Sequence, residues 1–147
     1  MGASIEFSPA KAMPEEWPQQ LFDGLFLVNN TVTITKKSDD FYRLTVNQLV
    51  LFDVWLPKKD ITVFPDTDYI EGIRWLEKIN IPDFLEKFKA IDYSILLEIR
   101  YSLDEKEQEL IITAAKEIVR LCDGIALFDQ DIGSYKHHHV YLLSDFE

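Results

Sequence analysis

Residues 94–129 read SILLEIRYSLDEKEQELIITAAKEIVRLCDGIALFD, and the stretch carries the signals of a strand, a helix and a second strand in succession. The part from 93 to 101 is rich in β-branched and aromatic residues, which favours a strand. Ser102 and Glu105 have the spacing of a capping box, which predicts the start of a helix. Apolar residues then recur at helical spacing over 105–122 and predict an amphipathic helix.

A glycine and a short apolar run complete this unit. Gly124 predicts the end of the helix, because glycine readily adopts the left-handed conformation found at helix ends. Residues 125–129 read IALFD and predict a short buried strand. The whole stretch therefore predicts a β-α-β unit.

A similar pattern occurs near the start of the chain. Residues 21–30 read LFDGLFLVNN and residues 121–130 read LCDGIALFDQ, so both carry Asp-Gly followed by an apolar run. The similarity predicts a second β-α-β unit, with a strand at 3–8, a helix at 14–23 and a strand at 25–28. The alternative is a chance similarity, because Asp-Gly commonly follows a helix.

The rest of the chain adds strands, two helices and a terminal extended segment. Alternating or continuous apolar residues predict strands at 31–36, 41–46 and 49–56, extended segments at 61–64 and 135–143, and helices that begin near 66 and at Pro82. With no linker in the sequence, we expect one domain over 1–147. Its expected class is α+β, a mixed or antiparallel sheet with helices on one face and split β-α-β elements of the ferredoxin-like kind.

Charge is the strongest signal of the bulk composition. The 147 residues include 26 acidic and 15 basic side chains, for a net charge of −11. Because phosphate backbones are polyanions, this charge disfavours binding to nucleic acid or to an anionic membrane. It favours a basic protein partner, and the alternative is an ordinary acidic surface that serves solubility.

The sequence also bears on compartment. No apolar run is long enough to span a bilayer, and the N-terminus lacks the pattern of a signal peptide. The lone cysteine, Cys122, lies on the apolar face of the predicted helix, so no intramolecular disulfide can form. These features predict a cytoplasmic protein.

Candidate chemical groups are few. His137 and His139 would share one face of a strand, where Asp129 and Asp131 could complete a metal site; a solvated strand face is the alternative. The sequence has no nucleophile motif and no glycine-rich phosphate loop, and Cys122 fits buried packing better than catalysis. We therefore expect no cofactor, and an enzymatic function has no support from a motif.

Aromatic residues beside carboxylates are the better candidates for a binding surface. Large aromatic side chains anchor many protein interfaces, although most of them are buried in cores. The expected partner-binding residues are Trp55, Asp53, Asp129, Asp131, Tyr135, His137 and Tyr141.

The chain resembles small acidic bacterial immunity-type proteins, which neutralise toxins. The resemblance lies in its size, its charge and the pattern of residues 121–129, with Gly133 and Tyr135 after it. It covers about a quarter of the chain and identifies no single family. It implies an inhibitor that masks a basic toxin. Two alternatives are a small metal-dependent enzyme that uses His137 and His139, and a homo-oligomeric scaffold whose edge strands pair.

Overall fold

The computed structural model describes residues 3–58, 81–100, 104–136 and 139–146. Within these ranges the chain forms one seven-stranded antiparallel sheet, with order β2-β3-β4-β5-β1-β6-β7. The strands are β1 (Ser4–Ser8), β2 (Val32–Ser38), β3 (Phe41–Val46), β4 (Leu49–Trp55), β5 (Ile95–Ile99), β6 (Ile125–Phe128) and β7 (Val140–Tyr141). The helices are α1 (Trp17–Phe26), α3 (Ile81–Lys89), α4 (Glu105–Cys122) and the short 3-10 helix η2 (Leu143–Phe146).

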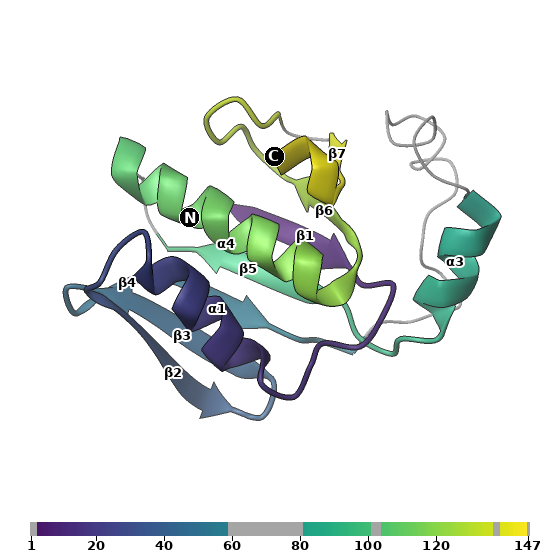
Figure 1. Ribbon diagram of the computed structural model, residues 1–147, viewed down its shortest axis with the longest axis horizontal. Helices are drawn as coiled ribbons and strands as arrows, with labels where there is room; N and C mark the ends of the chain where they lie inside the picture. The colour runs from purple at the N-terminus through teal and green to yellow at the C-terminus, as the bar shows by residue number, and fades with distance from the viewer. Residues whose placement is uncertain (1–2, 59–80, 101–103, 137–138, 147) are drawn as a thin grey trace.

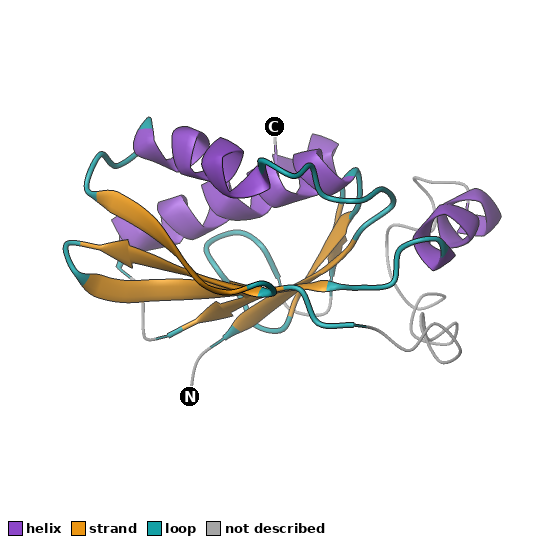
Figure 2. Ribbon diagram, turned by 90° about the horizontal axis from the view of Figure 1, so that it is seen from below, coloured by secondary structure: helices purple, strands orange, loops and turns teal. Residues whose placement is uncertain are grey.

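The long helices α1 and α4 lie on the same face of the sheet, while α3 lies at one end of the molecule (Figures 1 and 2). This layered arrangement confirms the predicted α+β class. Among the described residues, none of the helices has the length and apolar character needed to cross a membrane.

The predicted β-α-β unit forms with another strand inserted into it. β1 pairs antiparallel with both β5 and β6, so Ile5 lies opposite Leu97 on one side and Phe128 on the other. β5 and β6 therefore run in the same direction on either side of β1, and α4 connects them. The ferredoxin-like arrangement as a whole is not confirmed, because α1 leads to the edge strand β2 and a three-stranded meander returns the chain to β5.

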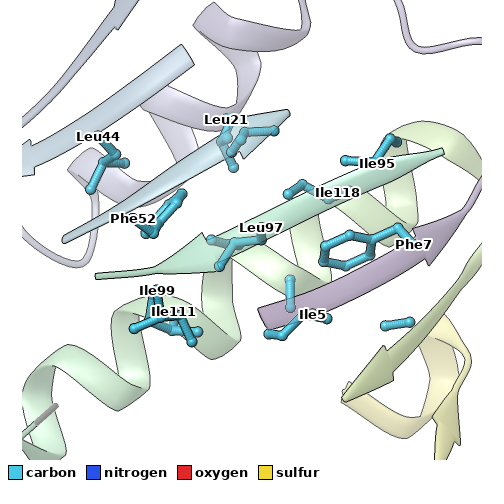
Figure 3. Packing of buried hydrophobic residues seen from close by; sticks show 14 of the residues in the cluster. Ile5, Phe7, Leu21, Leu44, Phe52, Ile95, Leu97, Ile99, Ile111 and Ile118 are labelled. Carbon is cyan, nitrogen blue, oxygen red and sulfur yellow. The ribbon is translucent and has the colours of Figure 1, made fainter. Parts of the chain in front are cut away.

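The core lies between the sheet and these two helices. Figure 3 shows Ile5, Phe7, Leu97 and Ile99 of the sheet with Ile111 and Ile118 of α4, all of them at most 2% exposed. Alternate residues of a strand point to opposite faces, so the same strands turn their other side chains away from the helices. Asp53 of β4 is one of the side chains on the face of the sheet that lies opposite α1 and α4.

The second predicted unit does not form as predicted: its first strand and its helix are present as β1 and α1, but the strand predicted at 25–28 is wrong. α1 continues through residues 25 and 26, where a strand was expected, because Trp17, Leu21 and Leu25 recur at helical spacing and are all buried. The helix ends when the amides of Val28 and Asn29 both donate to the Leu25 carbonyl. The first Asp-Gly pair therefore lies inside a helix and the second follows one, so the two segments are not structural repeats.

The start and the end of α4 are each set by a residue other than the predicted one. Asp104 is the N-cap: its carboxylate accepts from the Glu107 amide at 2.8 Å, and the Glu107 carboxylate accepts from the Asp104 amide at 3.1 Å. Ser102, the predicted cap, lies outside the described residues. At the other end Asp123, not Gly124, adopts the left-handed conformation, with φ of 50°. The predicted helix range of 105–122 is confirmed.

The C-terminal segment is less extended than predicted. Among the described residues of this segment, Val140–Tyr141 pairs as a strand with Ala126 and Leu127, Tyr135 forms an isolated bridge with Ile132, and the helix η2 begins at Leu143. The expected extended segment at 61–64 and the expected helix from 66 lie outside the described residues. The helix predicted to begin at Pro82 is confirmed as α3.

Candidate interaction surfaces

Asp53 lies near the middle of β4 on the face opposite α1 and α4. Its side chain is 1% exposed, and its carboxylate accepts hydrogen bonds from Arg43 Nε at 2.9 Å and Nη2 at 3.3 Å. Arg100 Nε lies 3.1 Å from Oδ2, the carboxylate oxygen that also accepts from Arg43 Nη2. The hydrogen bond to Asp53 raises the pKa of Arg43. The carboxylate is thus enclosed by two guanidinium groups, and it is the arginines that reach solvent.

Trp55 lies on the same face, at the end of β4. Its ring packs against that of Phe41, its cross-strand neighbour, with 3.9 Å between ring centroids and the ring planes tilted by 31°. The Arg43 guanidinium lies 5.3 Å from the centroid of the Phe41 ring, within the range of a cation–π contact. Trp55 and Phe41 are both half-buried, so the aromatic pair combines structural contacts with a partly accessible surface.

Tyr135 and Tyr141 belong to an aromatic cluster at the C-terminal end. The Tyr135 ring stacks between Phe128, at 5.5 Å, and Phe146, at 5.1 Å, and meets Tyr141 edge to face at 5.0 Å. The Tyr141 side chain is buried, and its hydroxyl accepts from the Lys136 amide at 2.8 Å. This cluster fixes the end of the chain against β6.

Asp129 and Asp131 lie beside this cluster and have separate partners. The Asp129 carboxylate accepts from both the amide and the hydroxyl of Ser4, each at 2.9 Å, and so joins the ends of β1 and β6. Asp131 forms an ion pair with Lys136 at 3.7 Å. His139 is exposed, and His137 lies outside the described residues.

The structure therefore divides the predicted site residues into two groups. Asp53 and Trp55 lie on β4, whereas Asp129, Asp131, Tyr135 and Tyr141 follow or pair with β6, three strands away in the sheet. No cluster of three or more His, Cys, Asp or Glu side chains that could hold a metal is found in the part of the chain that the structure describes. The binding roles of these residues stay predictions.

A surface missed by the sequence reasoning lies at the C-terminal end of α1. Phe26, Leu27 and Val28 are 46%, 88% and 45% exposed, and Leu49, at the start of β4, is 64% exposed. Leu49 pairs with Val46, which pairs with Val32 directly after the α1–β2 loop, so all four residues lie at one end of the sheet. We call Phe26, Leu27, Val28 and Leu49 the apolar end.

The backbone of the apolar end is held in place on both sides. The turn that ends α1 hydrogen-bonds to the Leu25 carbonyl, and the Asn29 side chain accepts from the amide and the hydroxyl of Thr31 at 2.9 and 2.6 Å. Beside it lies an open cavity of about 510 Å³, closed on the far side by Lys106, Glu109 and Leu110 of α4.

The sequence carried a signal for this surface. The run LFLV at 25–28 fits a buried strand when it is taken alone. Extending the helical spacing of Trp17, Leu21 and Leu25 instead leaves the last three residues of that run outside the buried stripe. Exposed apolar residues in succession are uncommon on a monomeric surface and often mark an interaction site.

Burial also changes the titration of three groups. It raises the pKa of Glu6, which lies in the central strand β1 on the face opposite the helices. It raises the pKa of Tyr135, with smaller contributions from Tyr141 and Asp145. It raises the pKa of the Cys122 thiol to about 12, since the side chain is fully buried among the core residues on α4.

Comparisons of the chain with protein-family models, with curated proteins and with solved structures found no match.

Proposed function

We propose that the protein binds and masks a basic partner protein, as an inhibitor of the immunity type does. The observation that carries the proposal is the apolar end, where four large apolar side chains are exposed together in a chain with net charge −11. Such a combination suits a partner that brings apolar side chains into contact and carries positive charge around them.

Charge and apolar contact would serve different steps of binding. A charge of −11 draws a basic protein into encounter from a distance set by the ionic strength, and it chiefly affects the association rate. Asp23 and Glu109 are exposed near the apolar end and would meet positive groups at the rim of the contact. The lifetime of the complex then depends on the apolar side chains that lose contact with water when the two proteins bind.

The turn geometry supports this assignment. Because the turn hydrogen bonds fix the backbone of Leu27 and Val28, little conformational freedom remains to be lost on binding. Complete burial of one leucine side chain is worth about 1.5–3 kcal/mol, so Leu27 alone could contribute a tenfold to hundredfold change in affinity.

The first test is affinity capture from a lysate of the source organism at low and moderate salt, with mass spectrometry of the retained proteins. We expect one stoichiometric basic protein that is released as salt rises. The purified partner would then be titrated by calorimetry against the wild type and the Leu27→Ser variant. Leu27 is almost fully exposed, so its replacement should leave folding stability within about 0.5 kcal/mol of wild type.

The matched control is Lys89→Ser, at an exposed position on α3. We expect Leu27→Ser to weaken partner binding by about tenfold or more, while Lys89→Ser changes it little. If both variants bind the partner with the wild-type affinity, the partner contacts a surface other than the apolar end. Retention of no basic protein at either salt concentration would count against the proposed function itself.

A further inference from the structure

Among the strands that the structure describes, none lies beside the outer edge of β2. β2 is the terminal strand of the sheet, and in the described part of the chain it pairs only with β3. Every second residue of such a strand directs its backbone N–H and C=O groups away from the sheet. Thr33 and Thr35 are exposed along it. Another extended chain could form hydrogen bonds with these backbone groups.

Only one half of β2 carries the features that usually protect an edge. Lys36 and Lys37 supply charge, and a register shift between Lys36 and Ser38 distorts the strand at that end. The first half, from Val32 to Thr35, has regular pairing and no charged residue. That unprotected half begins directly after the α1–β2 loop of the apolar end.

A cavity borders the middle of β2, from Thr33 to Lys36, on the side that faces α1. Its volume is about 340 Å³, and it is lined by Pro18, Gln19 and Phe22 of α1, Ile34 and Lys36 of β2, and Tyr42 of β3. The Tyr42 ring is fixed by an edge-to-face contact with Trp17, at 4.7 Å between centroids. A strand added beside β2 would turn every second side chain toward the face of the sheet that carries α1, and one of these side chains could enter the cavity.

We propose that β2 accepts an extended segment of the partner protein as an additional strand, with one apolar side chain of that segment in the cavity. The inference rests on the proposed function, since it names the part of a protein partner that docks and the edge that receives it. Backbone hydrogen bonds supply the affinity in this mode of recognition, and the cavity supplies the selectivity. The segment would continue onto the apolar end, which makes both features one contact surface.

A second copy of this chain fits the edge less well. Two chains of charge −11 repel one another. Antiparallel pairing of β2 with its own copy along its length would also set the distorted Lys36–Ser38 end against the regular Val32 end.

The probe is a capped seven-residue peptide, the length of β2, with apolar side chains at alternate positions and lysine at the others. Two N-methylated versions each block one alternate set of backbone amides. Binding to the full chain would be followed by amide chemical shifts. We expect shifts on β2 and the first half of α1, and a loss of binding of about tenfold or more for one methylated version only.

Protein variants test the cavity itself. Gln19→Trp places a large side chain at the cavity, and Gln20→Trp, at the next exposed position of α1, is the matched control because Gln20 does not line it. We expect the first to weaken peptide binding by about tenfold and the second to leave it unchanged. Binding that both methylated versions retain, shifts away from β2, or no binding up to about 1 mM would overturn the inference.

The peptide's charge separates this inference from the proposed function. A glutamate version of the same peptide that binds as well as the lysine version, still on β2, would keep the strand docking and contradict the preference for a basic partner. Sedimentation of the chain alone tests the alternative that a second copy of the chain pairs with β2. A concentration-dependent dimer that Gln19→Trp abolishes would overturn the docking of a partner segment in favour of a second copy.

Discussion

The two Asp-Gly pairs give a sharp test of how the structure uses glycine. A β-carbon on Gly124 would lie 2.1 Å from the backbone oxygen of Ser8, whereas β-carbons essentially never come within 3.0 Å of such a neighbouring atom. A β-carbon on Gly24 would instead lie 3.1 Å from the Glu117 side chain, which can move. Substitution to alanine should therefore have opposite consequences at the two sites.

For Gly124→Ala, the gap between β6 and β1 must open by about 0.9 Å at the pair formed by Ser8 and Ile125. Overpacking of this kind typically costs about 1–3 kcal/mol, and a backbone neighbour gives way less easily than a side chain. Alanine also lowers the conformational entropy of the unfolded chain, which stabilises the folded state by roughly 0.4–1 kcal/mol and offsets part of this cost. We expect a net loss of about 2 kcal/mol in the free energy of unfolding.

Gly24→Ala lies within α1, where alanine is favoured over glycine by about 1 kcal/mol. A shift of a few tenths of an ångström in Glu117, which is ion-paired with Arg120, offsets part of this gain. We expect this variant to match or exceed the wild type in stability.

Equilibrium unfolding in urea, followed by circular dichroism and tryptophan fluorescence, measures both variants. With a denaturant dependence of about 1–3 kcal/mol per molar urea, a loss of about 2 kcal/mol lowers the midpoint by roughly 0.7–2 M for Gly124→Ala. The reasoning is refuted if Gly124→Ala unfolds at the wild-type midpoint, or if Gly24→Ala is the more damaging substitution.

Three further predictions use single residues. Asn47 and Gln48 form the β3–β4 turn with φ of 52° and 70°, so Gln48→Gly should raise thermal stability by roughly 0.5–1 kcal/mol in calorimetry; a lower melting temperature would contradict the turn geometry. Burial raises the pKa of Glu6 above its ordinary value of 4.5, so the folded state holds the Glu6 proton more tightly than the unfolded state does. The free energy of unfolding therefore falls as pH rises from about 4.5 through the pKa of Glu6 in the folded state. Glu6→Gln should therefore stabilise the protein at neutral pH and lose this advantage below about pH 4.5 in urea melts, and a gain that does not vary with pH would refute the assignment. Cys122, with its pKa near 12, should resist iodoacetamide at pH 8 until the protein is unfolded, as intact mass spectrometry would show; rapid labelling of the native protein would contradict its burial.

The elements with strong local signals were predictable from the sequence. Helix α4 has an apolar stripe, an acidic first turn and a capping box, and its range was predicted residue for residue. β3 alternates strictly and was also predicted with its observed bounds. In these segments local preference and tertiary packing favour the same structure, so either is sufficient for the assignment.

The misassigned elements are those where a local pattern fits two structures. Residues 25–28 suit a buried strand by composition, but the packing of Leu21 and Leu25 against the core extends the helix. Asp53 was predicted as a partner-binding residue because carboxylates beside aromatic residues suit a contact surface, and this role stays a prediction. In the structure Arg43 and Arg100 come from two other segments of the chain to enclose its carboxylate. No spacing in the sequence shows that these three residues meet, nor that the β2 edge borders a cavity.

The position of β1 in the sheet has a consequence for how the chain folds during synthesis. β2, β3 and β4 are neighbours in sequence and can pair as soon as they emerge from the ribosome. β1 emerges first, but its two partners are separated from it by roughly 90 and 120 residues of chain. Ile5 and Phe7 must therefore stay unburied until α4 and β6 have been made, and this interval is when the nascent chain is most exposed to aggregation and to chaperones.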